Sequence, residues 1–336
     1  MKYIRATTFL GFEETALAVG LDPEALLRAA GLQPKDIRNE KNRISINAAA
    51  AIFHHAALAS GCEDFALRVS RHRKLSVLGP LAMLTYVEPT VREAVAAVLR
   101  YQAMHTNAVH AHLVEQDGLA YLGCHVDLER NVPGRQAHEL TIATINKILS
   151  VLLGPAWRPL QVCFRHGPPR VQTLHSAVFR TDVEFNSGAD CVILRSSDLD
   201  REISTADPQL ARNVRDYLST LELPAQASLR FEVRQVVEIL IVSGNCTAEA
   251  VAQRLGLPVR TFYLRLKQDD ASFAAIVNDV RKEIAVRKLE TADASMSEIS
   301  GILGFSSLPA FSRWFRQHFG CTARDWVADQ ASVRNR

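Results

Sequence analysis

Basic side chains that could bind phosphate occur in two short segments near the C-terminus, residues 258–268 and 306–317. Neither segment contains an Asp or a Glu. Their basic residues are Arg260, Arg265, Lys267, Arg313 and Arg316. Guanidinium and ammonium groups bind phosphate oxygens through charge-assisted hydrogen bonds, so a basic face without acids suits a polyanionic partner.

Three histidines form a second group that could do chemistry, in a predicted β-hairpin at residues 108–126. Apolar and polar residues alternate on either side of Asp117-Gly118, a dipeptide that favours a two-residue hairpin turn. The candidate effector-binding residues on one face of this hairpin are His110, His112, Tyr121 and His125. Three imidazoles could bind a metal ion or an anionic ligand. A solvated polar face backed by an apolar one would produce the same pattern, and a register shift of one residue would break up the group.

A run of charged residues, Arg71-His-Arg-Lys74, leaves two interpretations open. It could bind a carboxylate effector, because Arg pairs well with carboxylates. It could equally be the solvated end of a helix.

The two basic segments belong to an internal repeat, with one copy at residues 249–267 and the other at residues 297–316. The matched pairs are Val251 and Ile299, Leu255 and Leu303, Gly256 and Gly304, and Leu266 and Phe315. Each copy predicts a short helix, a glycine turn and a second helix, which is the plan of a DNA-binding helix-turn-helix. A helical bundle whose repeat serves packing alone is the alternative, but it explains neither the duplicated glycine turn nor the acid-free faces.

A long amphipathic helix is predicted between the two copies, from Phe273 to Glu290. Ser272 is its candidate N-cap, and Ser295 and Glu298 form a capping box that opens the next helix. At ~1.5 Å per residue this helix would span roughly 27 Å, close to the ~34 Å between successive major-groove turns on one DNA face. Two modules on this spacer could therefore read adjacent grooves from one side.

Residues 229–330 resemble the DNA-binding domain of the AraC/XylS family of bacterial transcription regulators. The likeness rests on Ser297-Glu-Ile-Ser-Gly-Ile-Leu-Gly-Phe-Ser306, on Ala-Phe-Ser-Arg-Trp-Phe-Arg at 310–316 and on Phe-Gly-Cys-Thr at 319–322. It implies two helix-turn-helix units joined by a long helix. The DNA-binding residues that it implies are Arg260, Thr261, Tyr263, Leu264, Lys267, Ser307, Leu308, Ser312, Arg313 and Arg316.

The chain departs from the family pattern where Tyr263, Leu264 and Leu308 replace polar residues, and where Pro258 and Pro309 occur. Apolar side chains can contact a thymine methyl group but cannot read a guanine edge. We therefore expect direct readout to depend mainly on Arg260 and Arg313, with a preference for A·T pairs.

The first 220 residues resemble the arabinose-binding-type N-terminal domain of AraC-family regulators of the ornithine-utilization-regulator type. The likeness rests on Phe65-Ala-Leu-Arg-Val69, Leu78-Gly-Pro-Leu-Ala-Met-Leu84, Pro89-Thr-Val-Arg-Glu-Ala94 and Val183-Glu-Phe185. It implies small-molecule sensing and dimerisation.

The composition excludes several classes of protein. The 336 residues are 48% apolar, and no apolar window is long enough to span a membrane, so we expect a cytoplasmic protein that joins the nucleoid when bound to DNA. The six cysteines have neither zinc-knuckle nor disulfide spacing. No GxSxG, GxGxxG, P-loop or HExxH pattern occurs, so we expect no enzyme and no cofactor.

The net charge of +3 is unevenly distributed along the chain. Residues 228–336 hold 15 Lys and Arg against 12 Asp and Glu, whereas the first 227 residues hold 24 of each. The basic excess therefore lies in the last third, with the repeat.

Together these features predict an α+β ligand-sensing domain with a small antiparallel sheet, followed by an all-α domain with two helix-turn-helix units joined by a long helix. The expected boundaries are residues 1–222 for sensing and dimerisation, 223–228 for a linker and 229–330 for DNA binding. The expected function is that of a sequence-specific transcription activator controlled by a small-molecule effector. Its expected partners are promoter DNA, RNA polymerase and a second copy of the chain. A metal- or pH-responsive regulator that uses His110, His112 and His125 is the alternative.

Overall fold

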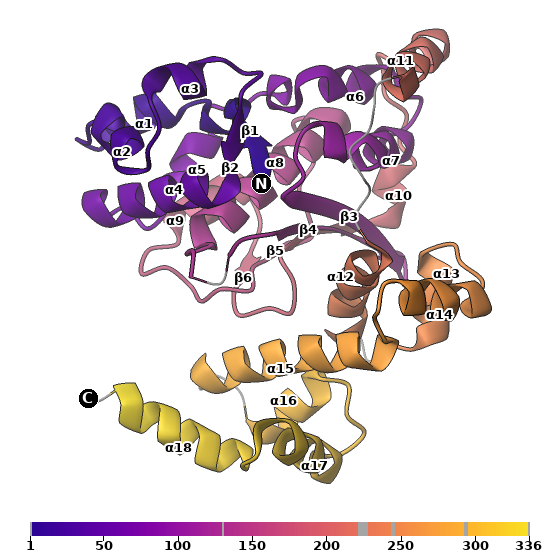
Figure 1. The fold of residues 1–336 in the computed structure, drawn as a ribbon. Coiled ribbons are helices and arrows are strands. Elements are labelled where there is room, and N and C mark those ends of the chain that lie inside the picture. The colour runs from indigo at the N-terminus through magenta and orange to yellow at the C-terminus, as the bar shows by residue number, and fades with distance from the viewer. Residues whose placement is uncertain (1, 130, 221–227, 243–245, 292–294, 335–336) are drawn as a thin grey trace. The chain divides into compact units, whose positions relative to one another are not determined.

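The computed structural model describes residues 2–129, 131–220, 228–242, 246–291 and 295–334. The predicted linker at residues 223–228 lies outside these ranges, apart from Ser228. The chain divides into two compact units, Met1–Phe185 with Asp190–Gln226 and Asn186–Ala189 with Ala227–Arg336. We refer to them as unit 1 and unit 2 (Figure 1).

Unit 1 combines helices with two sheets. Its α-helices are α1 (Phe12–Ala18), α2 (Pro23–Ala29), α3 (Pro34–Arg38), α4 (Ile46–Ser60), α5 (Phe65–Ser70), α6 (Leu84–Val87), α7 (Val91–Tyr101), α8 (Arg135–Leu153), α9 (Thr173–Phe179), α10 (Ser196–Leu199) and α11 (Pro208–Thr220). Short 3-10 helices lie at Ala6–Phe9, Leu75–Met83 and Gln102–Met104. The strands are β1 (Tyr3–Arg5), β2 (Arg43–Ser45), β3 (Val109–Gln116), β4 (Leu119–Val126), β5 (Gln161–Cys163), β6 (Val183–Glu184) and β7 (Cys191–Arg195).

The main sheet has five strands in the order β3-β4-β7-β5-β6, and β1 pairs with β2 in a separate ribbon. The prediction of an α+β domain is confirmed, with one difference in the sheet. The β5–β6 pair is parallel, while the other pairs are antiparallel. A parallel pair needs a crossover rather than a tight turn, and here the connection between the two strands contains α9.

The hairpin of β3 and β4 has the register that a two-residue turn at Asp117-Gly118 implies, with His110 opposite His125 and His112 opposite Gly123. Its turn residues Asp117 and Gly118 both have positive φ, 52° and 78°. A two-residue type I′ turn, whose twist matches that of the strands, requires positive φ at both of its central residues.

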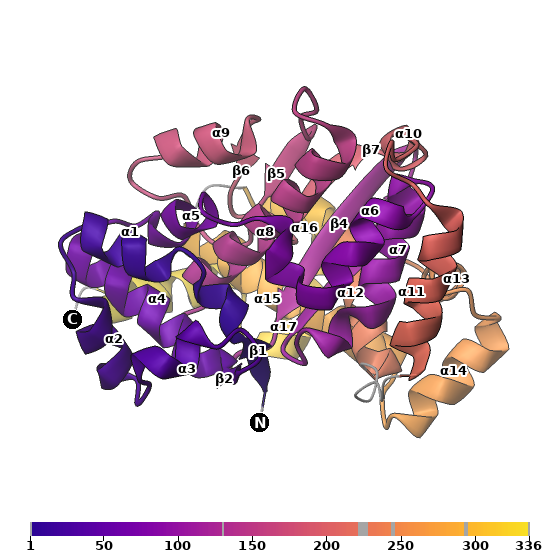
Figure 2. The same cartoon turned by 90° about the horizontal axis from the view of Figure 1, so that it is seen from above.

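Helices cover one face of this hairpin (Figure 1). The side chains of Leu122, Cys124 and Val126 on β4 are buried in a core that includes Leu140 and Ala143 of α8. Helices α6, α7 and α11 lie together in both views and share a smaller apolar cluster (Figure 1 and Figure 2). The helix-facing side of the sheet is thus the inside of unit 1.

In its described residues unit 2 has helices joined by turns and no strand. Its helices are α12 (Leu229–Val242), α13 (Ala248–Arg254), α14 (Val259–Gln268), α15 (Phe273–Thr291), α16 (Met296–Ile302), α17 (Leu308–Phe319) and α18 (Ala323–Arg334). The predicted all-α fold with two helix-turn-helix units is confirmed, α13 and α14 forming the first and α16 and α17 the second. No helix in the described ranges of either unit is long and apolar enough to cross a membrane.

The two helix-turn-helix units make the same turn with the same hydrogen bonds. In the first, Gly256 N–H bonds to the Gln253 carbonyl at 3.1 Å and Leu257 N–H bonds to the Ala252 carbonyl at 2.9 Å. In the second, the corresponding bonds join Gly304 to Gly301 at 2.9 Å and Phe305 to Ser300 at 3.0 Å. This is the Schellman pattern, in which a residue of positive φ ends a helix. The repeated glycine therefore serves the backbone at the turn.

The predicted spacer is one continuous helix, α15. Its buried stripe comprises Ile276, Val277, Val280, Ile284, Ala285 and Leu289. At its start the Ser272 hydroxyl accepts a hydrogen bond from Ala275 N–H, and the Ser295–Glu298 capping box opens α16. Both predicted caps are therefore present.

Gly301 in α16 and Gly304 in the turn that follows it offer a matched test of the turn. Gly304 has φ +70°, so Gly304→Ala should destabilise unit 2 by about 1–2 kcal/mol because an L side chain is strained there. Gly301 lies within the helix, with open space where a Cβ would sit, so Gly301→Ala should stabilise unit 2 by about 0.5–1 kcal/mol. Calorimetry of the full chain would measure both, and shifts of the same sign would contradict the turn geometry.

Candidate DNA-binding surface and ligand cavity

The second helix of the first unit, α14, has one buried face and one exposed face. Phe262 and Leu266 are fully buried. The predicted DNA-binding residues Arg260, Tyr263, Leu264 and Lys267 are exposed, and Thr261 is half-buried. Phe262 and Leu266 are four residues apart, so both side chains lie on the same side of the helix and that side is the buried one.

The second helix of the second unit, α17, is arranged in the same way. Phe311, Trp314 and Phe315 are buried, while the predicted residues Ser312, Arg313, Arg316 and Leu308 are exposed. The hydroxyl of Ser307 accepts a hydrogen bond from Ala310 N–H at 3.4 Å and so caps the start of α17. Ser307 therefore has a structural role that the sequence interpretation missed.

Each of these two helices is tied to the spacer α15 by specific side-chain contacts. The Phe262 ring of α14 meets Phe273 edge to face, with centroids 5.9 Å apart. The Trp314 indole of α17 donates a hydrogen bond to Asn278 Oδ1 at 2.9 Å. The exposed faces of α14 and α17 are thus held by the same rigid element.

Arg281 of the spacer ties the second turn to α15. Its Nε donates to the Leu303 carbonyl at 3.0 Å, and its guanidinium lies 4.4 Å from the centroid of the Phe305 ring. Burial lowers the pKa of Arg281, and the side chain makes both of these contacts inside the domain. It is therefore a packing residue rather than part of the basic surface.

A third arginine, Arg324, lines the same surface groove as Arg313 and Arg316. It is exposed, and it lies in the first turn of α18, where Thr322 and Asp325 cap the helix. The sequence interpretation missed Arg324. The Thr322–Asp325 capping pair could have revealed it, because that pair marks the start of another helix beside α17.

The strand pairing places the predicted residues His110, His112, Tyr121 and His125 in the β3–β4 hairpin of the main sheet. His110 lies directly across from His125, while the His112 ring occupies the space over Gly123, where an added Cβ would come within 2.9 Å of Nε2. Burial lowers the pKa of His110, so this imidazole is neutral at pH 7. Within the described ranges no group of three His, Cys, Asp or Glu side chains could hold a metal ion. The geometry therefore lends no support to the metal-responsive alternative.

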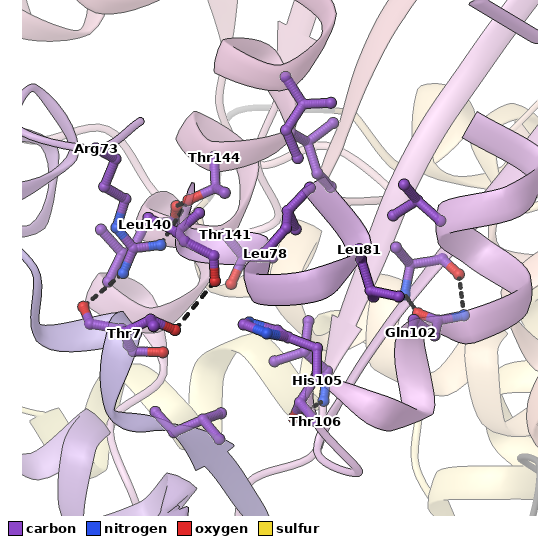
Figure 3. A pocket seen from close by; sticks show the side chains of 18 of the residues that line it. Thr7, Arg73, Leu78, Leu81, Gln102, His105, Thr106, Leu140, Thr141 and Thr144 are labelled. Carbon is purple, nitrogen blue, oxygen red and sulfur yellow. Dashed lines mark hydrogen bonds between the residues drawn. The ribbon is translucent and has the colours of Figure 1, made fainter. Parts of the chain in front are cut away.

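A cavity of about 150 Å³ lies inside unit 1, on the other face of the hairpin. Val109, Ala111 and Leu122 of the two strands line it, together with residues of α4, α7 and α8 (Figure 3). None of His110, His112, Tyr121 and His125 is among its lining residues. The structure thus separates the histidine face from the cavity.

The charge run at residues 71–74 divides between solvent and cavity. Arg71, His72 and Lys74 are exposed, whereas Arg73 is only 7% exposed and lines the cavity. Arg73 donates to the Thr144 hydroxyl at 2.7 Å and to the Thr8 carbonyl at 2.6 Å (Figure 3). The solvated-end interpretation therefore describes Arg71, His72 and Lys74, while carboxylate binding stays a prediction for Arg73 alone.

Sequence reasoning missed the remaining polar residues of the cavity, including Gln102 and His105. Gln102 bridges to the hairpin, since its side chain accepts from Ala111 N–H at 2.7 Å and donates to the Ala111 carbonyl at 3.1 Å. The polar lining as a whole, which also includes Thr7, Arg73 and Thr144, comes from several elements, so no local pattern in the sequence could have grouped it.

Comparison with known proteins assigns both units. A family model of the arabinose-binding domain of AraC transcription regulators matches residues 20–203, and a helix-turn-helix domain model matches residues 251–329. The chain is 28% identical to the HTH-type transcriptional regulator VirS of Mycobacterium tuberculosis, over 97% of this chain and 96% of that protein. It is 24% identical to the ornithine utilization regulator of Pseudomonas aeruginosa, over 91% of each.

Among solved structures, the transcriptional regulator CdpR from Pseudomonas aeruginosa aligns with 91% of this chain and 96% of its own, at 18% identity and a TM-score of 0.44. The arabinose-binding domain model alone covers more than half of the 336 residues, and the two regulators above match nearly the whole chain. The chain therefore belongs to the AraC family and is a DNA-binding transcription regulator with a ligand-binding N-terminal domain.

Proposed function

We propose that this protein is a transcription activator whose engagement of a promoter is controlled by a small-molecule effector in the cavity of unit 1. The observation that carries the proposal is the pair of exposed, acid-free faces on α14 and α17, both held by α15. RNA polymerase and a second copy of the chain are the expected protein partners. Control by an effector requires that it bind the DNA-competent and DNA-incompetent arrangements with different affinity.

The proposed contacts divide by chemistry. Arg260 and Arg313 would read base edges, since a guanidinium pairs with the two acceptors of guanine in the major groove. Lys267, Arg316 and Arg324 would bind phosphates and set the position of the domain on the duplex. Tyr263, Leu264 and Leu308, which are 51%, 59% and 42% exposed, would contact thymine methyl groups.

Loss of a base-reading arginine tests the DNA-binding surface. Arg313→Ala should cost about 1–3 kcal/mol, or roughly 5- to 150-fold in affinity, on the specific site, because a bidentate base contact is worth that much. Arg230→Ala is the matched control, since Arg230 is exposed in the same unit but lies on α12. Fluorescence anisotropy on a promoter fragment from beside the protein's own gene, at fixed salt, would compare them.

Footprinting on the same fragment would show the site, which should cover about two major-groove turns. The proposal fails if no fragment is protected, or if the two variants lose affinity equally.

The exposed leucines give a second, independent test. Replacing thymine by uracil in the site removes a methyl group, which should cost about 0.8 kcal/mol where a leucine contacts it. The same replacement should have no effect on Leu264→Ala when Leu264 makes that contact, so a double cycle of protein and DNA variants isolates the pair. Equal uracil effects in wild type and in Leu264→Ala and Leu308→Ala would show that neither leucine reads thymine.

A further inference from the structure

The cavity of unit 1 contains a buried cation, Arg73, that no acidic side chain in the described part of the chain neutralises. Arg73 is 7% exposed, and in the described ranges it forms no ion pair with an Asp or a Glu. Its two hydrogen bonds go to neutral oxygens, the Thr144 hydroxyl and the Thr8 carbonyl. A buried charge is costly unless it is paired, so this guanidinium is arranged for an anion that the protein itself does not supply.

Donor capacity remains on the guanidinium. Arginine has five N–H groups, and Arg73 Nε is buried with no hydrogen-bond partner in the described part of the chain. Burial lowers the pKa of Arg73 to about 10, which still leaves it protonated at pH 7. The cavity therefore presents a positive charge with unused donors under physiological conditions.

His105 adds a polar group without adding charge. Burial, with the nearby Arg5 and Arg73 charges, lowers the pKa of His105 to about 4, so its imidazole is neutral at pH 7. Its buried Nδ1 has no partner among the described residues. Figure 3 shows Arg73, Thr141 and Thr144 on one side of the cavity and Gln102 on the other, with the His105 ring between them. A polar ligand group here would meet both a cation and a neutral imidazole.

Apart from these polar groups and several threonines, the lining is apolar and mainly aliphatic. It includes Val77, Leu78, Leu81, Val98, Ile145 and Ile148. A cavity of about 150 Å³ accommodates a molecule the size of benzene, so a ligand of about six to eight non-hydrogen atoms would fill it. The cavity therefore suits a ligand that has one charged end and an apolar body.

We propose that the cavity binds a small aliphatic monocarboxylate, with the carboxylate paired to the Arg73 guanidinium and the hydrocarbon chain packed against the aliphatic wall. This assignment names the chemical class of the effector, and in that respect it rests on the proposed function. A dicarboxylate does not suit the site, because a second charge would be buried against the aliphatic wall. An amine would meet the Arg73 charge with the same sign.

Ligand binding to the full chain, without DNA, tests the proposal. Isothermal titration calorimetry at constant ionic strength would compare hexanoate with hexanamide, which has nearly the same shape and no charge, and with acetate, which has the charge and little chain. Hexanoate should bind about tenfold or more tightly than either, because a charge-assisted hydrogen bond and apolar burial are both needed. Equal binding of hexanoate and hexanamide, or of hexanoate and acetate, would overturn the proposal, as would no binding of any of them.

Variants of Arg73 test whether its guanidinium is the charge that favours hexanoate over hexanamide. Arg73→Met should abolish the preference for hexanoate over hexanamide, and Arg73→Lys should retain part of it. Arg71→Met is the matched control, since Arg71 is two residues away and exposed, and it should leave the preference unchanged. The comparison of hexanoate with hexanamide on the wild-type chain needs no variant, so the proposal stays testable if Arg73→Met fails to fold. If a folded Arg73→Met keeps the preference, the proposal is wrong and Arg73 serves only to bridge Thr8 and Thr144.

The DNA and ligand experiments separate the two proposals. Binding of a promoter fragment without any binding of hexanoate would leave the proposed DNA-binding function standing and remove the carboxylate assignment. Binding of hexanoate without a specific DNA site would support the carboxylate assignment for the cavity and remove the proposed function.

Discussion

The DNA-binding unit depends on the burial of one stripe of side chains along α15. This stripe, with Ile276, Val280 and Ile284 at its centre, makes the spacer a core element rather than an exposed connection. Because Phe262 packs on its first residue and Trp314 bonds to Asn278, neither basic helix can turn about its own axis without breaking a contact to α15. Two surfaces far apart in the sequence are therefore oriented by a single apolar interface.

A different constraint governs the ligand-binding unit. The hairpin must bury one face, and its tight turn sets which residues share that face. The apolar face closes over the cavity, and the histidine face is turned to the opposite side of the sheet. Inside, the packing leaves room beside a guanidinium that would be costly to bury without a ligand. Binding an anion there would relieve that cost, which couples occupancy to the stability of the folded unit.

Local chemistry explains why much of this molecule was predictable. The glycine turns, the caps at Ser272 and Ser295 and the Asp117-Gly118 hairpin all depend on residues within about five positions of one another, as short-range backbone hydrogen bonds do. The parallel β5–β6 pair was not predicted, since strand direction depends on how the connection through α9 returns to the sheet. The capping role of Ser307 and the position of Arg324 beside α17 were also missed.

The sequence by itself determined the DNA-binding plan, because a repeated helix, glycine and helix pattern specifies both the turns and the outward faces. Only the tertiary structure decided where the cavity of unit 1 lies. Arg71, Arg73 and Lys74 are equivalent as a run of charges, yet only Arg73 is buried, since it alone reaches Thr8 and Thr144. The physical reason is that burial of a charge is settled by partners more than sixty residues away in the chain, and no local pattern records them.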